Sequence, residues 1–247
     1  MRIQYACICH RGLVRSKNQD NLAWEKKCLP PVHDGMTEPA LGEQTPDRNL
    51  LFGVFDGLGG EPRGEAAAYI AARMTAESEF TGSAESLILL CREINRSVCD
   101  YARENALSSC GTTAALLSLG RKRVAGCNLG DSRIYLCRNG ILTQLSEDHV
   151  LPAFHRSKPP LLQYLGIPET EMKLEPTVFE KKPCRNDLYL ICSDGLTDML
   201  SDRRILDTLE EYSAVKEKAA ALLARSLEKG GRDNISFILI GIRPPMP

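Results

Sequence analysis

The stretch LLFGVFD, residues 50–56, decides the fold of this chain. A short apolar run of this kind is typical of a strand that is buried on both faces. LYLICSD, residues 188–194, repeats the pattern, and both runs end in an aspartate that is followed by glycine. Glycine lets the backbone turn sharply and approach a ligand closely. We therefore expect two central strands that each carry a carboxylate, Asp56 and Asp194, to the edge of the core.

Helices and further strands are predicted on both sides of these runs. Alternating apolar residues predict a strand over 2–9, and helical spacing predicts helices over 65–80, 84–105, 202–211 and 214–228. Strand-like runs at 112–119, 123–130, 132–140 and 141–145 predict an antiparallel meander, with Asn139-Gly140 as a hairpin turn. A last strand covers 234–242, and exposed Pro-rich loops are expected at 28–49 and 149–182. This order predicts an α+β domain with antiparallel sheets and segregated helices.

The charge balance excludes several partners. The chain has 247 residues, with 31 Lys and Arg against 32 Asp and Glu, and a formal net charge of −1. This balance gives no basic field for nucleic acid and no polybasic stripe for an anionic membrane, so neither partner is expected. The N-terminal residues lack the apolar core of a secretory signal, and no apolar run reaches the roughly 18 residues that span a bilayer. We expect a soluble, cytoplasmic protein.

The ten cysteines fit the same compartment. No two of them form a CxxC pair, and most lie in apolar runs, where cysteine behaves as a small hydrophobic residue. We predict reduced thiols rather than a disulfide framework.

Four aspartates lie at the ends of apolar runs: Asp56, Asp131, Asp194 and Asp233. A half-buried carboxylate is costly unless it meets a cation. Oxygen ligands without His or Cys suit Mg²⁺ or Mn²⁺, so the joint occurrence of these aspartates favours such a site. Each one alone has a plainer interpretation, because an Asp-Gly pair commonly forms a turn and Asp131 can pair with Arg133 in a hairpin.

Seven motifs, in order along the chain, resemble those of the metal-dependent protein phosphatases, the type 2C serine/threonine family. They are VRSKNQDN (14–21), FDGLGG (55–60), CGTTA (110–114), NLGDSRIY (128–135), LTQLSEDH (142–149), SDGLTD (193–198) and RDNIS (232–236). The resemblance implies a single catalytic domain over 1–247, built as a four-layer α-β-β-α sandwich in which two antiparallel sheets pack face to face between helices. It implies a protein serine/threonine phosphatase that hydrolyses phosphoserine and phosphothreonine by direct attack of a hydroxide bridging two Mg²⁺ or Mn²⁺ ions. Its partners would be phosphorylated proteins and an opposing serine/threonine kinase.

The resemblance also assigns the metal ligands. Asp56 resembles the carboxylate that bridges two ions, and Gly57 the residue whose carbonyl binds the second ion. Asp194 and Asp233 resemble the remaining protein ligands of the first ion. Asp131 matches an aspartate that helps to hold a third, weaker ion in some bacterial relatives, and the structural ion pair stays as its alternative.

The same motifs assign the residues that handle phosphate and water. Arg15 matches the phosphate-binding arginine of the family, whose guanidinium can grip two phosphoryl oxygens; its alternative is a solvated surface side chain. Asp20 matches the acidic position that orients metal-bound water. Gln19 stands where some relatives have a glutamate that ligates the second ion more directly. The expected catalytic set is therefore Arg15, Asp20 and Asp56.

Two departures from the family pattern concern proton donation and access. Leu58 occupies the place where animal members often have a histidine as general acid, which leaves water, His149 or His155 as the proton donor. The flap segment, residues 150–182, is short and holds Pro152, Pro159, Pro160 and Pro168. Substrate selection is therefore expected to differ from that of better-known relatives.

Two other functions stay open. The first is a catalytically weak member that acts as a sensor or partner-switching module, whose mark would be loss of the ligand aspartates; Asp56, Asp194 and Asp233 are all present. The second is a metal-dependent nuclease or small-molecule phosphohydrolase. The near-neutral charge disfavours the nuclease, and the rest needs a comparison of substrates.

Overall fold

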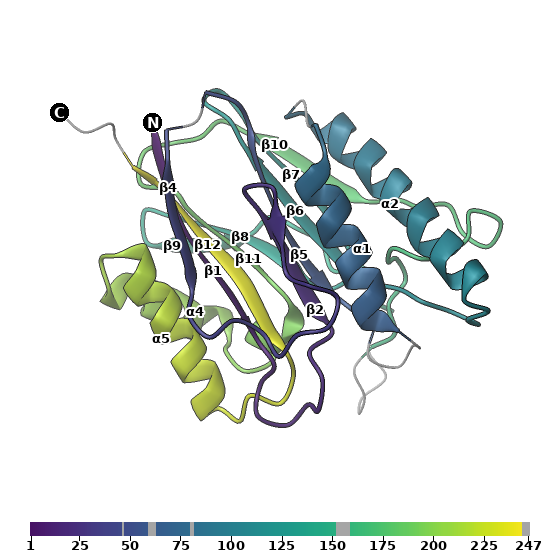
Figure 1. Ribbon diagram of the computed structural model, residues 1–247. Helices are drawn as coiled ribbons and strands as arrows, with labels where there is room; N and C mark the ends of the chain where they lie inside the picture. Colours follow the sequence, from purple (N-terminus) through teal and green to yellow (C-terminus); the bar gives the residue numbers. More distant parts are fainter. Residues whose placement is uncertain (46, 59–62, 80–81, 152–158, 244–247) are drawn as a thin grey trace.

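The computed structural model describes residues 1–45, 47–58, 63–79, 82–151 and 159–243. Within these ranges the strands form two six-stranded sheets, and all neighbouring strands in them run antiparallel. The sheets pack face to face, and helices cover their outer faces (Figure 1). No helix of the described ranges is long and apolar enough to cross a bilayer. The predicted α+β, four-layer α-β-β-α sandwich is confirmed.

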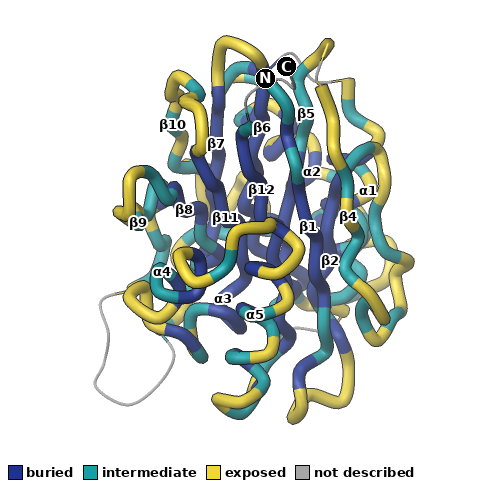
Figure 2. The backbone as a smooth tube through the Cα atoms, turned by 90° about the vertical axis from the view of Figure 1, so that its left-hand side faces the viewer, coloured by how far each residue is buried: buried dark blue, intermediate teal, exposed yellow. Residues whose placement is uncertain are grey.

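Each sheet combines strands from distant parts of the chain. The first sheet has the order β4 (Ala40–Gln44), β1 (Arg2–His10), β12 (Ile235–Arg243), β11 (Leu188–Cys192), β8 (Arg133–Arg138) and β9 (Ile141–Gln144). The second sheet has the order β10 (Thr177–Lys181), β7 (Val124–Leu129), β6 (Ala114–Leu119), β5 (Leu50–Asp56), β2 (Asp20–Trp24) and β3 (Lys27–Cys28). In Figure 2, β1, β11 and β12 are buried along most of their length, while β4 at the sheet edge is not.

The helices divide between the two outer faces (Figure 1). α1 (Gly64–Glu77) and α2 (Ala84–Glu104) pack on the second sheet, whereas α4 (Asp202–Glu211) and α5 (Val215–Glu228) pack on the first. The single-turn helix α3 (Asp194–Thr197) follows β11 directly. The sequence predicted α2 because its buried residues recur at helical spacing. Ser83 caps the first turn of this helix.

The LLFGVFD strand is buried on both faces, as its sequence indicates. Phe52 and Val54 point into the apolar layer between the two sheets, while Phe55 points to the layer under α1 and α2. All three side chains are fully buried. The ring of Phe52 packs against the ring of Tyr5 from the facing sheet, with 5.3 Å between ring centroids. Aromatic and aliphatic packing between the sheets therefore fixes the position of β5 and of the aspartate at its end.

The predicted antiparallel meander over 112–145 is only partly right. β6 pairs with β7, and β8 pairs with β9, but β7 and β8 belong to different sheets. The chain crosses between the sheets at residues 130–132, and Gly130 makes the turn with a φ of 98°. This crossing is the segment that contains Asp131.

Both predicted Pro-rich loops also contain strands. β4 lies in one and β10 in the other, and both are edge strands with mostly partial or full exposure. Edge strands carry few apolar residues, which is why composition made them look like loops. β2 was hidden for another reason: it opens with two polar residues, Asp20 and Asn21, that are nevertheless buried.

Candidate active site

Two aspartates from neighbouring strands face each other at one end of the second sheet. Asp20 opens β2, Asp56 closes β5, and the antiparallel register pairs them directly. Directly opposed residues have Cβ atoms about 4.5–5.5 Å apart and share one face of the sheet. Asp20 is only 2% exposed, and Asp56 is half-buried. Sheet geometry therefore brings these two carboxylates together.

The backbone of Asp56 is held by two threonines that directly precede the next strand, β6. The amide of Asp56 donates to Thr113 Oγ1 at 3.0 Å. Its carbonyl accepts from Thr112 Oγ1 at 2.9 Å and from the Thr113 amide at 2.9 Å. These hydrogen bonds fix the position of the Asp56 main chain.

Burial and the closeness of other carboxyl groups shift the pKa of Asp20. Burial raises the pKa of the Asp20 carboxyl well above its usual range, and the negative charges of Asp56 and Asp233 raise it further. Ser193 opposes the shift, because its Oγ donates a hydrogen bond to Asp20 Oδ2 at 2.9 Å. Three carboxylates therefore lie close enough to repel one another, and a cation placed among them would be stabilised.

Gly57 sits where no side chain fits. A Cβ at this position would lie 2.4 Å from the carbonyl oxygen of Gly64 and 2.6 Å from that of Gln19. The Gly57 amide donates to the Gln19 carbonyl at 3.1 Å. The side chain of Gln19 points elsewhere, since its Nε2 donates to Glu65 on α1 at 3.3 Å.

Asp194 and Asp233 lie next to the ends of two neighbouring strands of the first sheet, β11 and β12. Asp194 begins α3 directly after β11 and is only 4% exposed. Asp233 lies two residues before β12. A Cβ on Gly195 would stand 1.9 Å from the Asn234 carbonyl oxygen and 3.5 Å from Asp233 Cβ, so glycine permits the close approach of the two segments.

Arg15 reaches this group of carboxylates from a loop. Its Nη2 donates to Asp233 Oδ2 at 2.6 Å, and its side chain is 46% exposed. The hydrogen bond with Asp233 raises the pKa of the Arg15 guanidinium, and the charges of Asp56 and Asp20 add to the shift. The alternative for Arg15 was a solvated surface side chain. The structure instead pairs its guanidinium with Asp233, although about half of the side chain is exposed.

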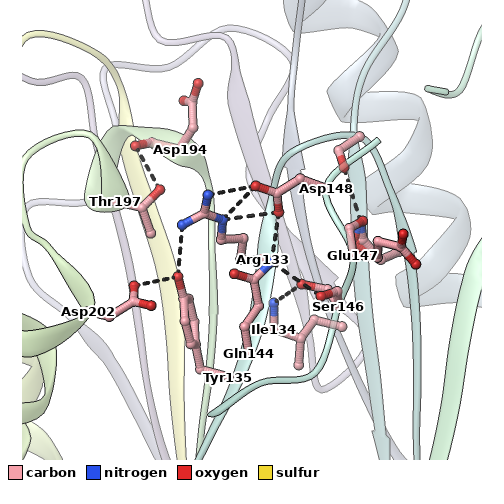
Figure 3. A network of polar contacts seen from close by, with 12 residues as sticks. Arg133, Ile134, Tyr135, Gln144, Ser146, Glu147, Asp148, Asp194, Thr197 and Asp202 are labelled. Carbon is pink, nitrogen blue, oxygen red and sulfur yellow. Dashed lines mark hydrogen bonds and ion pairs between the residues drawn. The ribbon is translucent and has the colours of Figure 1, made fainter. Parts of the chain in front are cut away.

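Asp131 lies in the crossing between β7 and β8. Its neighbour Arg133 belongs to a separate polar network (Figure 3). Nε and Nη2 of Arg133 donate to Asp148 at 2.6–3.0 Å, and its Nη1 donates to Tyr135 Oη at 3.0 Å. Tyr135 in turn donates to Asp202 at 2.9 Å. This network gives Arg133 a carboxylate partner other than Asp131.

His149 is held by both ring nitrogens. Nδ1 accepts from the Gly130 amide at 3.2 Å, and Nε2 lies 2.8 Å from Thr177 Oγ1. Burial lowers the pKa of the half-buried imidazole. These contacts describe a structural residue that joins the crossing at Gly130 to β10, rather than a free proton donor. The other histidine considered, His155, lies outside the described residues, as do Pro152 and the end of the FDGLGG motif.

The oxygen donors of this site suit a hard divalent cation in their chemistry. Carboxylates and backbone carbonyls are the ligands that Mg²⁺ and Mn²⁺ prefer, and a cation would relieve the repulsion that raises the pKa of Asp20. Across the residues that the structure describes, however, no three His, Cys, Asp or Glu side chains are arranged to hold a metal ion. Arg15 occupies Asp233 Oδ2, so an ion binding that oxygen would have to replace the guanidinium.

The sequence motifs did not point to two polar residues of this site. Ser193 holds Asp20 across a separation of 173 residues, and Asn234 binds the Gln19 amide across 215 residues. Both lie inside motifs, SDGLTD and RDNIS, but next to the aspartates that drew attention. The available signal in the sequence was a polar residue directly beside a candidate ligand, Ser193 next to Asp194 and Asn234 next to Asp233.

Comparison with known proteins gives a consistent result. The family model described as protein phosphatase 2C matches residues 38–229. The serine/threonine phosphatase stp of Listeria welshimeri is 31% identical over 253 aligned positions, which cover 93% of this chain and 92% of that protein. The serine/threonine protein phosphatase PstP of Mycobacterium tuberculosis is 29% identical over 97% of this chain and 45% of its own length.

Solved structures support the same fold. A crystal structure of a bacterial serine phosphatase superposes with a TM-score of 0.80 at 23% identity, covering 99% of both chains. The catalytic domain of PstP, described as a complex with 2 manganese ions, superposes with a TM-score of 0.74 at 26% identity, covering 99% of this chain and 100% of that one.

Proposed function

The chain belongs to the protein phosphatase 2C family, and we propose that it is a Mg²⁺- or Mn²⁺-dependent protein phosphatase acting on phosphoserine and phosphothreonine. The observation that carries this proposal is the gathering of Asp20, Asp56 and Asp233 around the Arg15 guanidinium. Carboxylates beside one half-exposed arginine suit a ligand made of cations and a phosphoryl group. The relative in complex with 2 manganese ions supports the choice of metal.

In this proposal the ends of three strands hold the cations. Asp56, Asp194 and Asp233 would supply carboxylate oxygens, and Gly57 its backbone carbonyl. Two divalent ions bound there would neutralise charge on the phosphoryl oxygens and activate water. Asp131, at the crossing between the sheets, is our candidate for a third and weaker ion.

Arg15 would bind the phosphoryl group. Its guanidinium has the planar fork that matches two phosphoryl oxygens, and 46% of its side chain is open to solvent. To reach a substrate it must give up Asp233 Oδ2, the oxygen that a cation would take. In this proposal, a cation that binds Asp233 therefore displaces the Arg15 guanidinium and makes it available for phosphate.

Asp20 would orient the attacking water. Its burial and the hydrogen bond from Ser193 to Oδ2 keep the carboxylate in one place beside Asp56. The Leu58 side chain has no proton to donate, and His149 is engaged by Gly130 and Thr177. We therefore assign protonation of the leaving group to water.

We place this activity on cytoplasmic phosphoproteins that an opposing serine/threonine kinase modifies. None of the ten cysteines, all of which lie in the described ranges, forms a disulfide, and this supports a reducing compartment. The experiment is a panel of matched phosphoserine, phosphothreonine and phosphotyrosine peptides, nucleotides and sugar phosphates, each with Mn²⁺ and with excess chelator. We expect metal-dependent turnover of the first two. Preference for a nucleotide or sugar phosphate would favour a small-molecule phosphohydrolase, and no turnover of any substrate would favour a sensor or partner-switching module.

A further inference from the structure

The buried side chain of Asn234 makes all of its hydrogen bonds to one loop. Its Nδ2 donates to the Arg11 carbonyl at 2.8 Å and to the Lys17 carbonyl at 2.9 Å. Its Oδ1 accepts from the Gln19 amide at 2.8 Å. Asn234 itself is 5% exposed. One amide group thus ties three points of residues 11–19, which have neither helix nor strand structure, to the start of β12.

Arg15 lies in the middle of this loop. The backbone is fixed at Arg11, four residues before it, and at Lys17, two residues after it. A further hydrogen bond joins the Leu13 amide to the Gly231 carbonyl at 2.7 Å. Because the Arg15 side chain is half-exposed and meets Asp233 through its guanidinium, the position of that guanidinium depends on how the loop backbone is held.

Asn234 also holds the other partner of this contact. Its backbone amide donates to Asp233 Oδ1 at 2.8 Å, while Arg15 takes Oδ2. A single residue therefore fixes the loop that carries the arginine and one oxygen of the carboxylate that the arginine meets.

We propose that Asn234 is a positioning residue that holds Arg15 where a phosphoryl group binds. This inference rests on the proposed function in one respect, namely that Arg15 binds the phosphoryl group. It predicts that loss of the Asn234 amide acts on phosphate affinity through Arg15, and not merely on folding.

The test compares Asn234→Ala with Arg15→Ala and with a matched control, Asn95→Ala. Asn95 is also buried, at 2% exposure, and its amide also holds a loop, through the Ile167 carbonyl at 2.9 Å and the Gly166 amide at 2.7 Å. Calorimetry with inorganic phosphate on the Mn²⁺-loaded protein gives Kd, phosphothreonine-peptide kinetics give KM and kcat, and thermal melting reports stability.

We expect Asn234→Ala and Arg15→Ala each to raise the phosphate Kd and the peptide KM by about tenfold or more, the scale of a lost charge-assisted hydrogen bond. Asn95→Ala should lower the melting temperature and leave the phosphate Kd unchanged. The double variant Arg15→Ala/Asn234→Ala should bind phosphate no more weakly than Arg15→Ala alone, because both changes remove one interaction.

An unchanged phosphate Kd in folded Asn234→Ala, or additive effects in the double variant, would overturn the inference. If Asn234→Ala does not fold, Asn234→Ser keeps a polar side chain too short to bridge both carbonyls, and the same outcomes apply to it. Phosphate binding without peptide turnover in the wild type would refute the proposed function while the phosphate titrations still test Asn234. A wild type that binds no phosphate would overturn both.

Discussion

Asp20 and Asp56 are cross-strand partners: the first residue of β2 lies directly opposite the last residue of β5. The pairing follows from the hydrogen-bonded register of the sheet and not from a flexible loop. It places a fully buried carboxylate against a half-buried one, in a position where each raises the free energy of the other's charged form. A site of this kind costs stability until a cation binds.

The first prediction concerns Asp56→Asn. Removing this charge relieves repulsion with Asp20, so the metal-free variant should melt no lower than the metal-free wild type. The wild type should gain stability with Mn²⁺, by about 2.7 kcal/mol when the ion is at a hundred times its Kd, and the variant should lose most of this gain. Thermal melting with and without Mn²⁺ measures both. Asp207→Asn, at an exposed ion pair on α4, is the control that should keep the gain.

The second prediction concerns Arg15→Lys. Lysine keeps the positive charge but loses the planar fork, so its KM for a phosphothreonine peptide should lie between those of the wild type and Arg15→Ala. Arg11→Ala serves as control, because Arg11 lies in the same loop but pairs with Asp34. Steady-state kinetics decide this, and a KM for Arg15→Lys equal to that of the wild type would show that charge alone is enough.

The third prediction concerns pH and His149. Burial lowers the pKa of this imidazole, so the unfolded chain takes up a proton at a higher pH than the folded chain. Stability should therefore be full above the unfolded pKa of about 6.5 and fall as the pH drops through that value toward the lowered folded pKa. In His149→Asn this loss should be smaller, since Asn does not titrate. Denaturant unfolding at several pH values measures it, and parallel pH profiles for the two proteins would refute it.

The fourth prediction concerns the Arg133–Asp148 ion pair. Both side chains are mostly shielded and joined by three close contacts, so either Arg133→Gln or Asp148→Asn should lower the free energy of unfolding by about 1–3 kcal/mol. Because the two residues share one interaction, the double variant should lose less than the sum of the single losses. Denaturant unfolding of the four proteins in this cycle gives the coupling energy, and strict additivity would contradict the contact.

Local sequence pattern was enough for β5, which ends in Asp56, and for β11, which ends two residues before Asp194. Each lies in an apolar run that ends in Asp-Gly, and the glycines at 57 and 195 stand where a Cβ would clash with backbone. Asp20 could not be found this way, because it follows a polar segment and begins a short strand. Its position came only from the resemblance of the NQDN motif to a known family.

Contacts between distant residues were beyond the sequence pattern. The runs that became β7 and β8 look the same whether they pair with each other or lie in facing sheets, so the meander prediction failed at Gly130. The hydrogen bonds of Ser193 and Asn234 to residues near the N-terminus depend on the first and second sheets meeting at this end. Local periodicity carries no information about such packing.

The most direct test of the central claim is the turnover of a phosphothreonine peptide against Mn²⁺ concentration, for the wild type and for Asp194→Asn. Asp194 is buried and begins α3, and it is a different ligand candidate from Asp233, the carboxylate that Arg15 contacts. We predict wild-type turnover that rises to saturation with Mn²⁺ and vanishes in excess chelator, and a variant that is folded but slower by about a thousandfold, the equivalent of several kcal/mol. Undiminished turnover in Asp194→Asn, or in the chelated wild type, would contradict a metal-dependent phosphatase built on these aspartates.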